Sequence, residues 1–117
     1  MLSNRMQLTS KAEEQLRRLK TLTGVTPNVL SRIAFFLSIE NSYLYEKDSA
    51  NITLNGSLVL DKNTWLGDTA QATELLLKML YPDLNNREII KAWASHVEDG
   101  IANLRNHKSL ASFCLAI

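Results

Sequence analysis

The sequence predicts a mainly α-helical protein, in which a compact domain of four to five helices follows a short strand-like segment near the N-terminus. Two observations support this class. Apolar residues recur with helical spacing over several segments, and most of these segments follow residues that commonly cap helices. The length of 117 residues, with 45% hydrophobic and 21% charged residues, is that of one globular domain. We therefore expect a single domain over residues 1–117.

The first part of the chain predicts a strand followed by a helix. Residues 5–9 alternate polar and apolar side chains, which is typical of a short strand. Ser10 and Glu13 have the spacing of a capping box, so a helix is expected to begin there and to continue to about Thr23. Gly24 is suited to end this helix, because glycine adopts the left-handed conformation at little cost.

A second helix is predicted over residues 27–40, with Thr26 as its N-cap and Pro27 in its first turn. Apolar side chains cover most of the circumference of this helix, so it must be buried on more than one side. In a chain of this size, one of these sides is expected to face another subunit. The sequence therefore predicts a homo-oligomer.

The middle of the chain is the least helical part. Residues 52–60 carry Asn-Gly at their centre and predict either a small hairpin or an irregular loop. Asp68 is a candidate cap for a helix over about residues 69–80.

The longest helix is predicted over about residues 86–106. Asn85 and Glu88 have capping-box spacing at its start, and Gly100 would permit a close contact with another helix. The last residues place apolar side chains at i, i+3, i+4 and i+7, which indicates a docked helix face. These side chains are Leu110, Phe113, Cys114 and Ile117.

Few residues are suited to catalysis or to metal binding. The two histidines, His96 and His107, would lie about 16 Å apart along a helix, too far for one ion. We interpret His96 as an edge-of-core or surface residue, and Trp65 and Trp93 as core residues. The glycines are scattered, so no phosphate-binding loop is indicated. We expect no catalytic residue, no metal and no cofactor.

The sequence also indicates where the protein is found. It has no run of about 18 apolar residues and no apolar segment of a secretory signal near its start. The lone Cys114 cannot form an internal disulfide. We expect a cytoplasmic protein that does not insert into a membrane.

The net charge of +1 conceals an uneven distribution. Residues 1–32 carry six basic and two acidic groups (+4), whereas residues 33–117 carry seven basic and ten acidic groups (−3). Such a basic segment is a candidate surface for the phosphates of a polyanion. The predicted contact residues are Lys11, Arg17, Arg18, Lys20 and Arg32, the last one weaker because its helix is expected to be buried.

A structural interpretation of these charges competes with the functional one. Glu13–Arg17 and Glu14–Arg18 are i,i+4 pairs, each of which stabilises a solvated helix by about 0.2–0.5 kcal/mol. This interpretation does not account for Lys11, Lys20 or Arg32.

Residues 5–40 resemble a ribbon-helix-helix DNA-binding unit. In that fold two chains pair their strands, and the outward side chains, here Arg5, Gln7 and Thr9, contact bases in the major groove. The resemblance implies a transcriptional regulator that binds a specific operator. A subunit with a purely structural role and no nucleic-acid contact is a third hypothesis.

A second resemblance covers nearly the whole chain. The run from Leu19 to Arg32, LKTLTGVTPNVLSR, is similar to the N-terminal signature of the DndE family, and Leu66-Gly67-Asp68 and the helix with His96 and Gly100 fit the same family. The family belongs to the bacterial system that replaces a non-bridging oxygen of the DNA backbone with sulfur (phosphorothioation). The resemblance implies a non-catalytic homotetramer that binds duplex DNA, nicked in particular, through basic surface residues. The sulfur chemistry would then lie in partners such as a cysteine desulfurase, DndC and DndD.

Overall fold

The computed structural model describes residues 2, 4–47 and 52–104. The elements are, in chain order, β1 (Arg5–Met6), α1 (Ser10–Thr23), α2 (Pro27–Glu40), β2 (Leu60–Asp61), α3 (Lys62–Leu66), a 3-10 turn (Gly67–Thr69), α4 (Ala70–Leu80) and α5 (Asn86–Leu104). The predicted mainly helical class with a short N-terminal strand is confirmed. The apolar stripe predicted near the C-terminus, and with it His107 and Cys114, lies outside the described residues.

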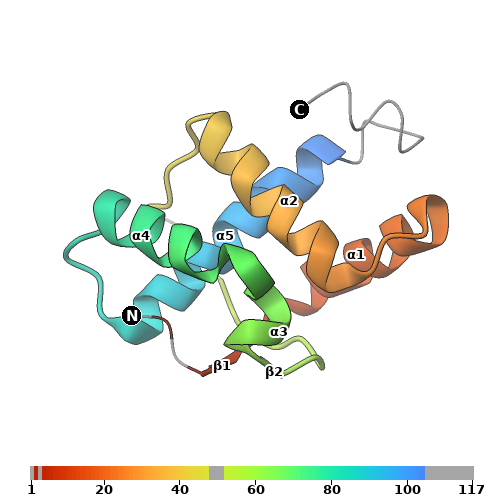
Figure 1. The fold of residues 1–117 in the computed structure, drawn as a ribbon, viewed down its shortest axis with the longest axis horizontal. Helices are drawn as coiled ribbons and strands as arrows, with labels where there is room; N and C mark the ends of the chain where they lie inside the picture. The colour runs from red at the N-terminus through yellow and green to blue at the C-terminus, as the bar shows by residue number, and fades with distance from the viewer. Residues whose placement is uncertain (1, 3, 48–51, 105–117) are drawn as a thin grey trace.

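Helix α5 is the central element, and α2 packs along it in the most extensive helix–helix contact of the fold (Figure 1). A Cβ atom on Gly100 would lie 1.9 Å from the carbonyl oxygen of Ala34. The two backbones therefore touch at this crossing, which only glycine permits. The close contact predicted at Gly100 is confirmed.

The bounds predicted for the first two helices are confirmed, but the cap of α1 differs from the prediction. Thr9, not Ser10, is its N-cap, and the Thr9 hydroxyl accepts a hydrogen bond from the Ala12 N–H at 3.1 Å. The carboxylate of Glu13 is thus not needed for the cap. At the other end Gly24 has a φ of 77° and its N–H donates to the carbonyl of Lys20 at 2.8 Å, as predicted.

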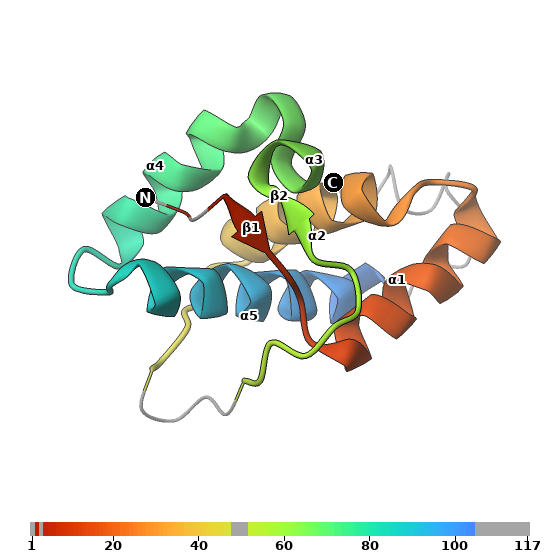
Figure 2. The ribbon, with the colours of Figure 1, turned by 90° about the horizontal axis from the view of Figure 1, so that it is seen from below.

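The two short strands pair antiparallel, with Arg5 opposite Asp61 and Met6 opposite Leu60. The hairpin predicted as one possibility over residues 52–60 is therefore not formed. The segment is held against other parts of the chain instead, and the Gly56 N–H donates to the Leu8 carbonyl at 2.8 Å. Figure 2 shows the segment running past β1 before it enters β2.

The helices of the second half follow the predicted order, with one addition. The short helix α3 precedes the predicted helix, and its cap is Asp61, whose Oδ1 accepts from the Thr64 N–H at 2.8 Å. Asp68 lies in the 3-10 turn and does not cap α4, which begins at Ala70.

The start of α5 agrees with the predicted capping box. The Asn85 side chain accepts from the Glu88 N–H at 2.9 Å, and the Glu88 carboxylate accepts from the Asn85 N–H at 3.1 Å. Among the described residues, no single helix combines the length and the apolar composition needed to cross a membrane. Helices α1 and α2 do so only as a pair with a bend of 106° between them.

The core contains the two tryptophans, as predicted, and also His96, which was not predicted to lie there. Trp65 and Trp93 are fully buried and meet edge to face with ring centroids 5.7 Å apart. His96 is 0% exposed, with Nδ1 2.9 Å from the Ser38 hydroxyl and Nε2 2.6 Å from the Tyr81 hydroxyl. Burial lowers the pKa of His96 to about 4. The prediction of an edge or surface position was wrong, because two hydroxyl partners satisfy both ring nitrogens inside the core.

Candidate nucleic-acid interface

Helix α1 presents its basic side chains to solvent. Its buried face is formed by Ala12, Leu16 and Leu19, together with the carboxylate-bearing side chain of Glu13. The basic residues of this helix are all exposed; they are Lys11, Arg17, Arg18 and Lys20. These side chains are accessible to solvent, while their contact with DNA stays a prediction.

The basic residues of α1 form two pairs on different sides of the helix. At about 100° per residue, Lys11 and Arg18 lie within about 20° of one another, and Arg17 and Lys20 within about 60°. About 100° separates Arg17 from Arg18. We call these the Arg17–Lys20 side and the Lys11–Arg18 side.

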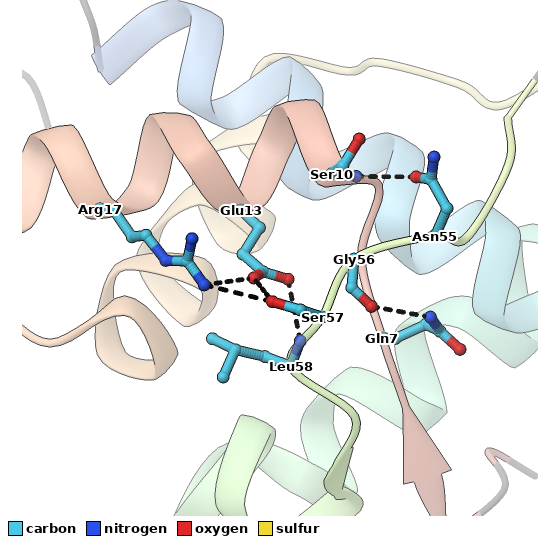
Figure 3. A network of polar contacts seen from close by, with 8 residues as sticks. All are labelled: Gln7, Ser10, Glu13, Arg17, Asn55, Gly56, Ser57 and Leu58. Atoms are coloured by element: carbon cyan, nitrogen blue, oxygen red, sulfur yellow. Dashed lines mark hydrogen bonds and ion pairs between the residues drawn. The ribbon is translucent and has the colours of Figure 1, made fainter.

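The Arg17–Lys20 side is built around the buried carboxylate of Glu13 (Figure 3). This carboxylate accepts hydrogen bonds from the Ser57 hydroxyl at 2.5 Å and the Leu58 N–H at 3.0 Å, and it pairs with Nη2 of Arg17 at 2.6 Å. Burial raises the pKa of Glu13, but the hydrogen bonds from Ser57 and Leu58 and the charge of Arg17 outweigh this effect and hold the pKa below its ordinary value. Glu13 is thus ionised at neutral pH.

The same network ties the segment 55–58 to the start of α1 (Figure 3). The Ser10 N–H donates to the Asn55 side chain at 2.8 Å, and the Gln7 amide donates to the Gly56 carbonyl at 3.0 Å. A Cβ atom on Gly56 would lie 2.5 Å from Oε2 of Glu13. Glycine at this position therefore lets the segment lie directly on the carboxylate.

The Lys11–Arg18 side has acidic neighbours. Lys11 lines a cleft of about 220 Å³ together with Glu98 and Asp99 of α5. Arg18 pairs with the exposed Glu14 at 2.8 Å. Both predicted i,i+4 ion pairs are therefore present, but this side has three nearby carboxylates for its two cations and is less suited to a polyanion.

Arg32 does not join the basic residues of α1. Its guanidinium donates to the carbonyls of Trp65 at 2.8 Å and Thr64 at 3.0 Å, at the C-terminal end of α3. A cation at this end of a helix is favourable, because the last carbonyls have no partner within the helix. Gly67 leaves the space that the guanidinium fills, since a Cβ atom there would lie 2.7 Å from it. Arg32 is therefore built into the fold.

One part of this surface was not predicted from the sequence. The docking of segment 55–58 onto Glu13 joins residues more than forty positions apart in the chain, as in the pair Ser57–Glu13. Asn-Gly signals a turn but does not reveal which part of the chain the turn contacts.

Within the described residues, we find no group of three or more histidine, cysteine or acidic residues arranged to hold a metal ion.

Two solved structures share this fold and are of proteins described as involved in DNA phosphorothioation. The crystal structure of DndE from Escherichia coli B7A is 58% identical, with a TM-score of 0.87, and the match covers 89% of this chain and 98% of that chain. The structure of a DndE mutant with glycine-to-lysine substitutions is 56% identical, with a TM-score of 0.85, covering 89% of this chain and 99% of that one.

The family model for the DNA sulphur modification protein DndE matches residues 5–112, and the chain belongs to the DndE family. The family resemblance drawn from the sequence is thereby confirmed. A search of curated proteins found no match.

Proposed function

We propose that the protein is a non-catalytic component of a bacterial DNA phosphorothioation system, acting in the cytoplasm, and that it binds the phosphate backbone of duplex DNA, nicked duplex in particular. Membership of the DndE family supports the assignment of the protein to this system. The observation that supports the binding is the Arg17–Lys20 side of α1, which carries two exposed cations, one of which, Arg17, contacts Ser57 of a segment rich in polar groups. Lys11 and Arg18 are secondary contacts in this proposal, and Arg32 is the weakest of the predicted contacts, because its guanidinium already donates to the carbonyls of Trp65 and Thr64.

The chemistry of Arg17 suits it to a phosphate. Its two hydrogen bonds, to Glu13 and to Ser57 at 3.2 Å, both use Nη2. Within the described residues, the N–H groups of Nη1 and Nε make no hydrogen bond, so each remains available to donate to a phosphate oxygen. Lys20 has no ion-pair partner within the described residues. Each cation that neutralises a phosphate releases counterions, so affinity is independent of sequence and sensitive to salt.

The test is the double variant Arg17→Gln/Lys20→Gln, with binding to random duplex, nicked duplex and single-stranded DNA measured by fluorescence anisotropy at two or more salt concentrations. The slope of log K against log salt should fall in magnitude by about 0.9 for each lost contact with duplex DNA. Lys78→Gln on the exposed surface of α4 is the control and should leave the slope unchanged. An unchanged slope in the double variant would contradict the assignment of the site. Absence of binding by the unsubstituted protein would favour a purely structural subunit.

The structure does not favour the ribbon-helix-helix regulator. In that fold the strand pairs with a second chain, whereas here an edge of β1 pairs with β2 of the same chain. A regulator would also respond to changes at Arg5 and Gln7 with an altered sequence preference, while a backbone-binding protein would bind unrelated duplexes about equally.

We further propose that the protein acts as a homotetramer, with other proteins of the system such as DndC and DndD as partners. The outer face of α2 supports self-association, because Val29, Ile33 and Phe36 line a largely apolar cavity of about 340 Å³ at the surface. Several linked copies would bind one long polyanion more tightly than a single weak surface.

A further inference from the structure

A second basic surface lies between β1 and the start of α5, apart from the basic residues of α1. We call it the β1–α5 groove. It has a volume of about 300 Å³ and is lined by Arg5, Gln7, Leu54, Asn86, Arg87 and Ile90. The lining brings together two guanidinium groups, two side-chain amides and two aliphatic side chains from three separate parts of the chain.

The charge of this groove distinguishes it from other cavities in the described part of the protein. Its lining holds two arginines and no carboxylate. Four other cavities combine a basic with an acidic side chain: Lys11 with Glu98 and Asp99, Lys78 with Glu74, Arg32 with Glu40, and Lys62 with Asp68 and Glu74. An anion entering the β1–α5 groove therefore meets two arginines and no carboxylate in the lining; the nearest carboxylate shown to act on either arginine is Asp61, beside Arg5 and outside the lining.

The first turn of α5 determines which side chains face the groove. Asn86, Arg87 and Ile90 are spaced by three and four residues, so they share one face of the helix. Glu88 faces elsewhere, because its carboxylate accepts from the Asn85 N–H and pairs with Lys47. The capping box thus keeps the one acidic residue of this turn away from Arg87.

The opposite wall is held by β1 and segment 52–58. Arg5 lies opposite Asp61 in the two-stranded sheet, and the Asp61 carboxylate accepts from both the N–H and the hydroxyl of Thr64, each at 2.8 Å. Gln7 is fixed by its hydrogen bond to the Gly56 carbonyl. The fold thereby positions Gln7, while the charge of Arg5 acts on the nearby Asp61 carboxyl and contributes to lowering its pKa.

The groove is connected to the Arg17–Lys20 side by segment 55–58. Gln7 contacts Gly56 from one direction, and Arg17 contacts the neighbouring Ser57 from the other (Figure 3). Segment 55–58 therefore lies between Gln7 of the groove and Arg17 of α1.

We propose that the β1–α5 groove binds phosphate groups of a nucleic-acid strand through Arg5 and Arg87, with the side-chain amides of Gln7 and Asn86 as further donors. Leu54 and Ile90 provide an apolar surface for the sugar or the edge of a base. This inference rests on the proposed DNA binding and adds a second point of attachment to it. It assigns a binding role to Arg87, which lies far in sequence from the basic N-terminal segment.

The test compares Arg87→Gln and the double variant Arg17→Gln/Lys20→Gln in the full-length chain, with Lys78→Gln as the matched control. Binding of a labelled random duplex is measured between 50 and 200 mM salt. If Arg87 contacts one phosphate, the slope of log K against log salt should fall in magnitude by about 0.9. A fourfold rise in salt should therefore weaken the binding of the variant by a factor about 3.5 times smaller than the factor by which it weakens the binding of the unsubstituted protein.

A second measurement uses amide chemical shifts, which report the groove independently of affinity. Titration with a short duplex should move the backbone amides of Gln7, Leu54, Asn86 and Arg87. An unchanged salt slope in Arg87→Gln, with no shift of these amides, would overturn the inference. If the Arg17/Lys20 variant still loses binding in that case, the proposed function stands. If inorganic phosphate moves the same amides and the duplex does not, the groove binds a free anion, and its role toward nucleic acid is refuted.

Discussion

Stability should depend on pH through His96, the buried histidine between α2 and α5. Its ring is 0% exposed and its pKa is lowered to about 4 by burial, against about 6.5 for an exposed histidine. Below pH 6.5 the unfolded chain therefore binds a proton that the folded chain excludes. Because the unfolded state binds more protons, stability is complete above about pH 6.5 and falls as the pH decreases toward 4.

The magnitude follows from the two pKa values. Between pH 7 and pH 5, proton uptake by the unfolded chain alone should lower the free energy of unfolding by about 2 kcal/mol. The ordinary pKa values of carboxyl groups lie below this window, so they contribute less to the change. The assay is urea unfolding followed by circular dichroism at several pH values and one protein concentration, because self-association would shift the midpoint.

Substitution of His96 identifies the source of the dependence. His96→Gln should flatten the profile between pH 5 and 7, whatever its effect on absolute stability. A steep profile that persists in His96→Gln would refute the assignment to His96. If His96→Gln fails to fold, the imidazole proton shifts of the unsubstituted protein give the same answer: His96 should remain neutral at pH 5.

Two further predictions concern packing and assembly. Gly100→Ala should destabilise the protein by about 2 kcal/mol or more, because the added Cβ would meet the Ala34 carbonyl oxygen at 1.9 Å. The control, Ala102→Gly at an exposed position of the same helix, should cost only about 1 kcal/mol. Equal losses of the two variants in urea unfolding would contradict this prediction. Light scattering after size exclusion should show an oligomer. Ile33→Lys, in the apolar cavity of α2, should reduce its size, whereas Leu22→Lys, at an exposed position of α1, should not. A monomer at micromolar concentration would contradict the homotetramer.

Features set by neighbours in the sequence were predicted most accurately. Pro27, Gly24 and the pair Asn85–Glu88 define helix ends through hydrogen bonds or backbone conformations that span only a few residues. The cap of α1 was misplaced by one residue because Thr9 and Ser10 have similar side chains. The choice between them depends on Thr9 also donating to Glu98 of α5, which is a tertiary contact.

Features set by distant contacts could not be predicted in the same way. Leu60 has a strand-like neighbourhood, but whether it pairs with residues 52–54 or with Met6 depends on how segment 55–58 docks on α1. His96 has the spacing of an edge residue on α5, and only Ser38 and Tyr81, which are distant in sequence, make burial of its polar ring acceptable.

In the candidate site, too, features set by neighbours in the sequence were predicted and features set by distant contacts were not. The exposed cations of α1 and their i,i+4 partners follow from helical spacing, and the structure contains both ion pairs. The groove at Arg87 does not follow from spacing, because it needs β1, segment 52–58 and α5 to meet. Net charge alone gave no indication of it, since Arg87 lies in the part of the chain with an excess of acidic groups.

Glu13 explains how a structural ion pair and a binding role for Arg17 can coexist. A carboxylate next to an arginine competes with phosphate for the same charge, so the pair would weaken binding if Glu13 depended on Arg17. Glu13 does not depend on Arg17 alone, because the Ser57 hydroxyl and the Leu58 N–H also donate to its carboxylate. These two donors remain when Arg17 turns toward a phosphate. Since these same contacts hold the pKa of Glu13 below its ordinary value, protonation does not relieve the competition near neutral pH. The salt concentration, rather than the pH, should therefore control how strongly this surface binds a polyanion.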